Sequence, residues 1–345
     1  MTLQQLLGIE LPIIQAPMAG VQGSALAIAV SNTGGLGSLP CAMLTSDAIR
    51  SELTAIKANT DRPFNVNFFC HVPPSANAER EALWRGALSP YYAEFGIDAS
   101  TIPVGAGRMP FTAEAARVLS EFKPVVVSFH FGLPSAELLA AVRSWGAKIL
   151  SSATTVEEAR WLEAHGVDAI IAQGFEAGGH RGMFLSDDLS TQVGMFALLP
   201  QIVRAVNVPV IAAGGIADAK GVAAAMALGA AGVQMGTAYL LCPETTTTAV
   251  HRAALSSDAA RHTALTNLFT GRPARGIVNR IMRDLGPISS APPAFPLATA
   301  AIAPLRAKAE SRGSGDFSPL WSGQNASGCR QAPAAELTRQ FAAAV

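Results

Sequence analysis

One histidine stands among four glycines in the stretch from Ala172 to Gly182, which reads AQGFEAGGHRG. Residues 167–171, immediately before it, have the composition of a buried parallel strand, so Gln173 falls where that strand should end. Glycines permit tight turns, and strand ends that carry polar and titratable groups are where α/β proteins bind ligands. We therefore expect His180 to face the reacting molecule, and Gln173, Gly178 and Gly179 to contact a cofactor.

Paired glycines predict a phosphate site nearby in the fold. Gly214 and Gly215 follow an apolar run at 208–213, a helix is expected to open at Asp218, and QMGT (234–237) ends the next run. Free backbone N–H groups and a helix N-terminus favour an anion there. No GxxxxGK[ST] motif occurs, and the segment GAGRMP at 105–110 lacks the last glycine and the strand of a dinucleotide fingerprint. A monophosphate is favoured, although such turns also bind phosphorylated sugars or nothing.

Other predicted strand ends carry amide or imidazole groups. Asn65 and Asn67 share one face of a strand at 64–68, and Asn67, nearer the end, could pair with a heterocycle or be structural. His130 follows the strand at 125–129. The small residues of QAPMAG (15–20) could approach a flat ring or form an ordinary turn.

The remaining histidines have weaker settings. His165 precedes Gly166 at a predicted helix end and is interpreted as a C-terminal cap. Three others are interpreted as surface or structural residues: His71, His251 and His262.

The combination of features is more specific than any one of them. A phosphate cradle, amide groups at strand ends and a glycine-flanked histidine indicate flavin mononucleotide (FMN), with its ring across the mouth of a barrel. Glu176 and His180 have no third metal ligand near them, so no metal is predicted and metal-dependent hydrolysis is disfavoured.

Eight apolar runs could form the strands that position these residues, and eight is the number that a closed (β/α)₈ TIM barrel requires. A doubly wound sheet is the competing architecture. The intervening segments predict helices, among them 24–32, 46–60 and 154–165 with Ser or Thr caps and 218–228 with an Asp cap. The runs are 13–17, 35–39, 64–68, 125–129, 148–152, 169–173, 208–213 and 232–236.

Two segments exceed the needs of a barrel. Residues 70–124 form a long insertion after the third strand, with Trp84, Tyr91, Tyr92, Phe95 and Phe111 and a Gly-Ala-Gly turn at 105–107. Residues 242–345 form an extension that contains a Pro-rich stretch at 287–304 and a helical tail from Pro333. We expect residues 1–69 and 125–241 to form the FMN-binding barrel, and the insertion and extension to cap the substrate together.

Composition restricts the partners. The 25 basic residues balance the 25 acidic ones, which argues against nucleic acid. The four cysteines lack CxxC spacing and the N-terminus lacks a signal peptide pattern, so a cytoplasmic location is expected. The uncharged stretch 221–242 contains glycines and Gln234, so it is interpreted as a buried helix and strand rather than a membrane span. The oligomeric state stays open.

The sequence resembles the bacterial class I nitronate monooxygenases, formerly called 2-nitropropane dioxygenases. The similarity runs in order through most of the chain, and AAGGIAD is the least specific piece because it recurs in many barrels. The resembling segments are QAPMAG (15–20), SNTGGLGS (31–38), DRPFNVNFF (61–69), SFHFGLP (128–134), AQGFEAGGHRG (172–182), AAGGIAD (212–218), VQMGTAYLL (233–241), GRPARGI (271–277) and SPLWSGQ (318–324).

This resemblance implies a TIM barrel with non-covalent FMN that oxidises alkyl nitronates, typically propionate 3-nitronate, with O₂ to a carbonyl compound and nitrite. His180 matches the active-site histidine, which would bond the nitro oxygens or act as a base, and His130 matches a histidine of the substrate pocket. The implied flavin contacts are Met18, Ala19, Asn67, Gln173, Gly178, Gly179, Gly215, Gln234, Met235, Gly236, Thr237 and Gln324.

One segment departs from the family pattern. Family members commonly supply tyrosines and a lysine from the C-terminal region to the substrate pocket, whereas residues 291–309 contain no tyrosine. Phe295, Arg306 or Lys308 could fill similar space. Two other functions stay open: an FMN-dependent NAD(P)H:quinone or enoyl-thioester reductase of related fold, and a non-catalytic FMN-binding protein.

Overall fold

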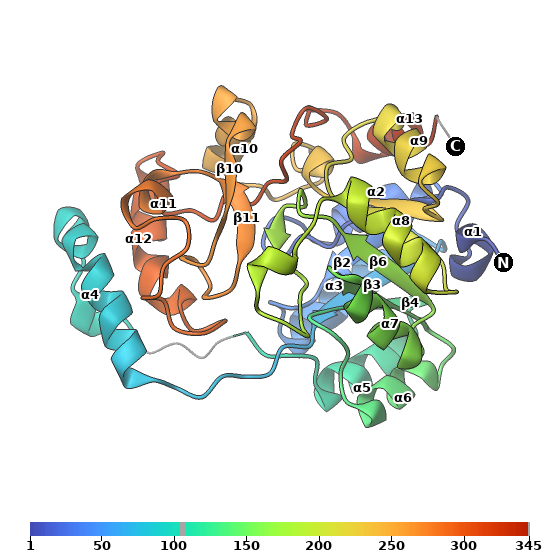
Figure 1. The fold of residues 1–345 in the computed structure, drawn as a ribbon, viewed down its shortest axis with the longest axis horizontal. Helices are drawn as coiled ribbons and strands as arrows, with labels where there is room; N and C mark the ends of the chain where they lie inside the picture. Colours follow the sequence, from blue (N-terminus) through green and yellow to red (C-terminus); the bar gives the residue numbers. More distant parts are fainter. Residues whose placement is uncertain (104–107, 344–345) are drawn as a thin grey trace.

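The computed structural model describes residues 1–103 and 108–343, and its larger part is a barrel of eight parallel strands, on the right in Figure 1. Parallel pairing runs in the order β1-β9-β8-β6-β5-β4-β3-β2, and a bridge between Ile14 and Leu36 joins β1 to β2. The predicted (β/α)₈ barrel is confirmed and the doubly wound alternative is wrong. The strands are β1 (Ile13–Gln15), β2 (Gly37–Pro40), β3 (Phe64–Phe69), β4 (Val126–His130), β5 (Lys148–Ala153), β6 (Ala169–Gln173), β8 (Val210–Ala213) and β9 (Gly232–Met235).

Helices cover the outside of the barrel because their apolar residues recur at helical spacing. In α5, for example, Ala115, Val118 and Leu119 are buried while the intervening Arg117 is exposed. The helices of this layer and the helix α1 before it are α1 (Leu3–Leu7), α2 (Ser24–Asn32), α3 (Ser46–Asn59), α5 (Ala113–Phe122), α6 (Ala136–Arg143), α7 (Val156–Ala164), α8 (Met195–Ala205), α9 (Ala219–Ala227) and α13 (Ala334–Ala342).

Three of the predicted helix caps are displaced by one residue. The caps are Gly23, Thr45 and Thr155 rather than Ser24, Ser46 and Thr154. The Thr154 hydroxyl instead donates to the buried Glu158 carboxylate at 2.7 Å, a tertiary contact that local spacing does not reveal. The Asp218 cap of α9 is confirmed. His165 is the C-cap of α7, as predicted, and its ring stacks on Trp161.

A second hydrophobic core joins the insertion to the extension. Figure 1 shows α4 (Ala78–Phe95) beside α12 (Thr299–Ser311), and Trp84, Tyr92 and Phe317 are buried in the core that these helices share. The extension also contains α10 (Ala249–Leu255), α11 (Arg280–Asp284), β10 (Thr263–Thr266) and β11 (Ala274–Ile277). Short 3₁₀ turns complete the described chain: η1 (Ala99–Thr101), η2 (Leu189–Thr191), η3 (Thr237–Tyr239) and η4 (Asp258–Arg261).

The barrel also recruits parts of the two added segments. In the insertion, α5 packs against α3 and α6, and Phe111 lies in the barrel core. In the extension, α13 packs against α2, α9 and β1. The Gly-Ala-Gly turn at 105–107, which is the first half of the GAGRMP segment, lies outside the described residues.

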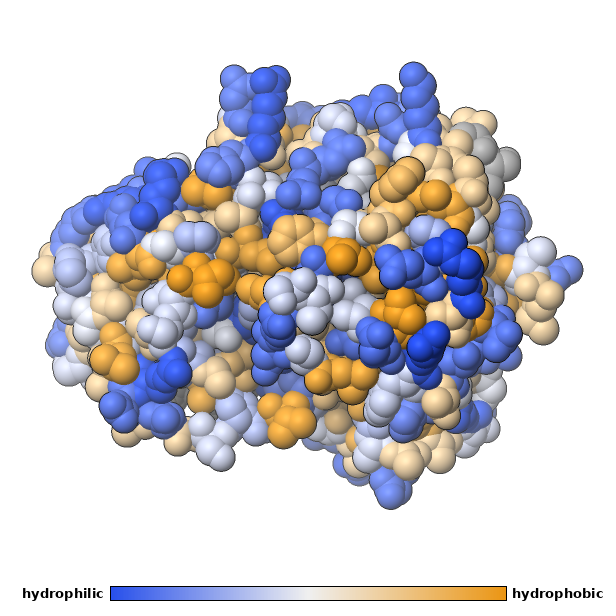
Figure 2. All heavy atoms as spheres, viewed as in Figure 1, coloured by the Kyte–Doolittle hydropathy of each residue, from blue (hydrophilic) through white to orange (hydrophobic). Residues whose placement is uncertain are grey.

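The uncharged stretch 221–242 forms most of α9, then β9 and η3, as its interpretation as a helix and strand predicts. None of the helices in the described ranges has the length and hydropathy needed to cross a membrane. On the face shown in Figure 2, hydrophobic residues form separate patches among hydrophilic ones.

Candidate active site

A cavity opens at the carboxyl ends of the barrel strands, beside the extension. It gathers residues from strand ends that are far apart in the sequence. Of the predicted site residues, Gln324 does not line it: this side chain is exposed, and its backbone N–H donates to the Glu176 carbonyl at 2.9 Å. The other predicted residues line it: Met18, Ala19, Asn67, His130, Gln173, Gly178, Gly179, His180, Gly215, Gln234, Met235, Gly236 and Thr237.

A buried arginine holds the loop that carries His180. Arg181 is fully buried, and its guanidinium donates to the carbonyls of Gln173 and Gly174 at 2.8 and 2.7 Å. Gly179 and His180 form a two-residue strand, β7, which pairs with β11. The predicted loop is therefore anchored on both sides, by the barrel and by the extension.

His180 presents a neutral ring to the cavity. Burial lowers its pKa well below the usual value, and the positive charges of Arg108 and Arg272 lower it further. Its Nε2 lies 2.9 Å from the Thr270 hydroxyl, while its Nδ1 has no hydrogen-bond partner among the described residues. Phe295 lies 5.3 Å from the His180 ring, centroid to centroid. A neutral imidazole with one free nitrogen can donate or accept one hydrogen bond at a substrate.

His130 is occupied by the protein on both ring nitrogens. Nε2 lies 3.2 Å from the His180 carbonyl, which can only accept, so Nε2 carries the proton. Nδ1 lies 3.0 Å from the Ser152 hydroxyl. Burial lowers the pKa of His130 to about 4. A Cβ at Gly182 would lie 2.8 Å from the His130 ring, so that glycine makes room for it. His130 therefore offers only ring carbons to a ligand.

Amide groups in the cavity fit a heterocycle. The side-chain oxygen of Gln234 is buried and has no hydrogen-bond partner among the described residues, so it can accept a hydrogen bond from a ligand. Asn67 and Asn65 lie on one face of β3, as predicted, and both side-chain amides donate to the Ser128 hydroxyl. Asn65 does not reach the cavity lining, but Asn67 does.

The glycine-rich loops fit a phosphate. Gly214 and Gly215 adopt left-handed backbone conformations, with φ of +118° and +73°, directly before α9. Gly178 packs so tightly that an added Cβ would lie 2.5 Å from the Gly323 nitrogen. Backbone groups and a helix N-terminus therefore lie at the end of the cavity formed by β8 and β9, as the sequence predicts.

The sequence analysis missed several residues around the cavity. Arg108 and Trp321 line it, and so does His251, which had been assigned to the surface or to structure. His251 is buried and donates from Nε2 to the Trp321 carbonyl at 3.1 Å. Of the three candidates for the missing tyrosines, only Phe295 meets His180, since Arg306 pairs with Glu310 and Lys308 is exposed. The hydropathy pattern of the sequence does not indicate that residues from these distant segments lie around one cavity.

The cavity is electropositive. Arg108 and Arg272 both lower the pKa of His180, and the described lining residues include no Asp or Glu. The Cζ of Arg272 lies 4.2 Å from the centroid of the Phe131 ring. The backbone of Phe131 has a φ of +70°. Such a site favours anionic ligands.

A TIM barrel whose mouth carries glycine-rich loops before a helix N-terminus, a buried unpaired amide oxygen and a neutral histidine has the features expected of a flavin-dependent oxidoreductase. The nitronate monooxygenase family model matches residues 1–343. The chain belongs to the nitronate monooxygenase family, which implies a flavin cofactor.

Individual relatives agree with this assignment. A nitronate monooxygenase of Paraburkholderia phytofirmans is 46% identical, with 97% of this chain and 92% of the relative covered. One from Pseudomonas aeruginosa is 44% identical, with 97% and 96% covered. The structure of nitroalkane oxidase from Streptomyces ansochromogenes superposes with a TM-score of 0.90 at 40% identity, covering 99% of this chain and 96% of that one. FabK from Thermotoga maritima is more distant, with a TM-score of 0.71 at 28% identity over 99% and 94% of the chains.

Proposed function

We propose that this protein is an FMN-dependent nitronate monooxygenase that converts alkyl nitronates and O₂ to a carbonyl compound and nitrite, with propionate 3-nitronate as the first substrate to test. One observation carries the proposal: an electropositive cavity, whose described lining residues include no carboxylate, contains a neutral histidine beside the glycine-rich loops. A nitronate is an anion that is already a carbanion equivalent, so the protein needs to bind and orient it rather than deprotonate it.

The residues divide between cofactor and substrate. Backbone groups of Gly215, Gly236 and Thr237 would hold the phosphate, and Asn67, Gln173 and Gln234 would bond the ring. The remaining cofactor contacts are assigned to Met18, Ala19, Gly178, Gly179 and Met235. Gln324 is assigned no cofactor contact, because it is exposed and is not among the residues that line the cavity. Bound FMN supplies the electron acceptor, and O₂ is the terminal oxidant.

His180 is assigned the catalytic role. If the Thr270 hydroxyl donates to Nε2, Nδ1 carries the proton and can donate to a nitro oxygen. If Nε2 instead donates to Thr270, Nδ1 can accept a proton from a neutral nitroalkane. His130 donates a hydrogen bond from Nε2 to the His180 carbonyl and thereby orients the His180 backbone. Its ring also forms part of the wall of the substrate site. We place the reaction in the cytoplasm, where the four free cysteines would stay reduced.

An absorbance spectrum of the purified protein, cofactor extraction and oxygen uptake test the proposal together. We expect a yellow protein that releases FMN and consumes O₂ with propionate 3-nitronate while nitrite accumulates. Rapid anaerobic bleaching by NADH, with no response to any nitronate, would instead establish a reductase. A yellow protein without either reaction would be a flavin-binding protein only.

A further inference from the structure

Arg108, from the insertion, faces the cavity next to the catalytic histidine. Its guanidinium carbon lies 5.8 Å from the centroid of the Phe295 ring, and the His180 ring lies 5.3 Å from the same centroid. Arg108 and His180 therefore meet at one aromatic side chain. No step assigned so far uses this cation.

The charge of Arg108 is not neutralised by the described part of the chain. None of the ion pairs among those residues includes Arg108. Burial lowers the pKa of its guanidinium, and the positive charge of Arg306 lowers that pKa further. Stacking against Phe295 compensates only partly for lost hydration. A guanidinium in such a place is a site for an anion, and its planar fork matches a carboxylate.

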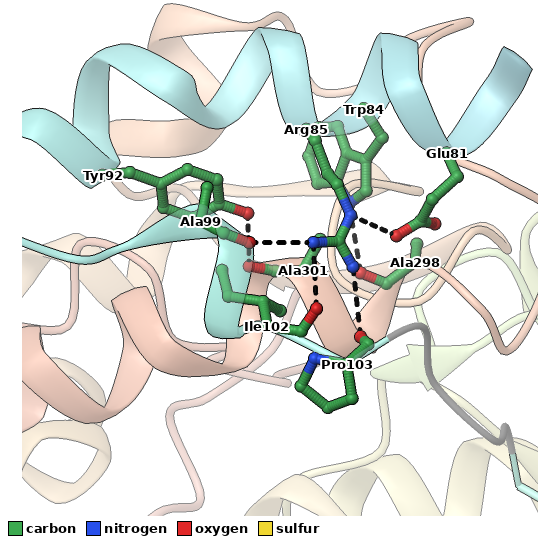
Figure 3. Close-up of polar contacts among 9 residues, drawn as sticks. All are labelled: Glu81, Trp84, Arg85, Tyr92, Ala99, Ile102, Pro103, Ala298 and Ala301. Carbon is green, nitrogen blue, oxygen red and sulfur yellow. Dashed lines mark hydrogen bonds and ion pairs between the residues drawn. The ribbon is translucent and has the colours of Figure 1, made fainter. Parts of the chain in front are cut away.

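One hydrogen bond fixes the Arg108 carbonyl, and others fix the described segment that ends at Pro103. His71 donates from Nε2 to the Arg108 carbonyl at 3.0 Å. Figure 3 shows the Arg85 guanidinium donating to the carbonyls of Ala99, Ile102 and Pro103, at 3.2, 3.0 and 3.1 Å.

The same close-up shows how that anchor is fixed to the extension. Trp84 and Tyr92, on the same helix as Arg85, donate to the carbonyls of Ala298 and Ala301 at 3.1 and 2.7 Å. The helix that fixes residues 99–103 is therefore bound to the same part of the extension that supplies Phe295.

We propose that Arg108 is a specificity-determining residue that binds a carboxylate on the substrate, so that the cavity prefers short nitronates with a second negative charge. The proposal rests on the proposed function. The nitronate end meets His180, and the carboxylate end meets Arg108 across the Phe295 ring.

The experiment compares two nitronates that differ in this one group, propionate 3-nitronate and propyl 1-nitronate. In R108M we expect kcat/KM for propionate 3-nitronate to fall about 100-fold, since a charge-assisted bidentate contact is lost, and kcat/KM for propyl 1-nitronate to change less than threefold. R108K keeps the charge without the fork and should show an intermediate loss for the carboxylated substrate. R117M removes an exposed arginine from α5 and should leave both values unchanged.

Flavin content and thermal midpoint are measured for every variant, and R108K carries the comparison if R108M does not fold. Equal losses for the two nitronates, with flavin retained, would overturn the proposal because Arg108 would then act on the nitronate group that both share. Unchanged kinetics for propionate 3-nitronate would overturn it as well. If the wild-type protein oxidises neither nitronate, the proposed function itself fails, which is a different result.

Discussion

At the scale of single residues, the site depends on a histidine kept neutral by its surroundings. Burial and the nearby Arg108 and Arg272 all oppose a positive charge on His180. A histidine with its usual pKa would be partly protonated near pH 6.5. Here the neutral form persists to more acidic pH, so the ring stays available for a hydrogen bond to the substrate.

Replacing His180 tests this role directly. In His180→Asn we expect flavin content to stay unchanged and kcat/KM with propionate 3-nitronate to fall about 100-fold, because the group that orients the nitronate is lost. His165→Asn is the matched control, since that histidine caps α7 away from the cavity. Turnover within threefold of wild type in His180→Asn would remove the histidine from the mechanism.

Thr270 is a positioning residue for His180. Its hydroxyl lies 2.9 Å from Nε2 and 3.4 Å from the Arg272 carbonyl, and the residue is buried. Thr270→Val keeps the shape but removes the hydroxyl, so we expect kcat to fall about tenfold with flavin content unchanged. Thr270→Ser should restore most of it. Proton-detected nitrogen shifts of the His180 ring should change in the valine variant and stay near wild type in the serine variant; equal kcat in both variants would contradict the assignment.

At the scale of elements, the loop between β6 and α8 connects the barrel to the extension. Arg181 bonds the end of β6, and β7 pairs with β11 in antiparallel register, Ala274 opposite His180. The Arg275 guanidinium also donates to the Phe175 carbonyl at 3.0 Å. The extension thus orders the loop that supplies the candidate catalytic side chain.

The β8–α9 loop provides a test of the phosphate site. Gly215→Asp adds a negative charge and a side chain at a φ of +73°, so we expect FMN affinity to fall at least 100-fold through like-charge repulsion and strain. Gly146→Asp has a similar φ of +86° and open space around it, and controls for strain alone. The readout is FMN retained after gel filtration. Full retention in Gly215→Asp would place the phosphate elsewhere.

At the scale of the whole molecule, the two largest hydrophobic cores divide the chain differently from the ranges expected from the sequence. The barrel core includes α5 and α13, although they come from the ranges expected to cap the substrate. The second core combines α4 with the extension. The helices α5 and α13 therefore cover the barrel. For the rest of 70–124 and 242–345, a shared role in capping the substrate stays a proposal.

Buried neutral histidines predict how stability depends on pH. Burial lowers the pKa of His251 to about 4, whereas an unfolded chain takes up the proton near pH 6.5. Below that pH the unfolded state binds more protons, so stability falls as pH falls from about 6.5 to about 4. At pH 5 the titration of His251 alone lowers the free energy of unfolding by about 2 kcal/mol.

His251→Gln removes the titration but keeps a donor for the Trp321 carbonyl. We expect urea unfolding of this variant to lose about 2 kcal/mol less than wild type between pH 7 and pH 5. His262→Gln, which alters a histidine at the C-cap of η4, is the control. Parallel stability curves for His251→Gln and wild type would show that His251 does not titrate as its burial requires.

The sequence by itself determined the barrel and most of the strand-end residues. Doubly covered parallel strands must be apolar almost throughout, and glycines must follow where the backbone turns toward a ligand, so both leave a local pattern. Because parallel strands of a barrel end at one mouth, Asn67, Gln173, Gly215 and Gln234 could be placed together without a structure.

Only the tertiary structure decided what surrounds His180. Arg108 comes from the insertion, and Thr270 and Phe295 come from separate parts of the extension. No shared periodicity links these segments, yet Thr270 and Phe295 contact the His180 ring, and Arg108 contacts Phe295. Local spacing also could not show that both nitrogens of His130 are occupied. Burial and the distances between charges set the pKa of each group, and these quantities exist only once distant parts of the chain are packed together.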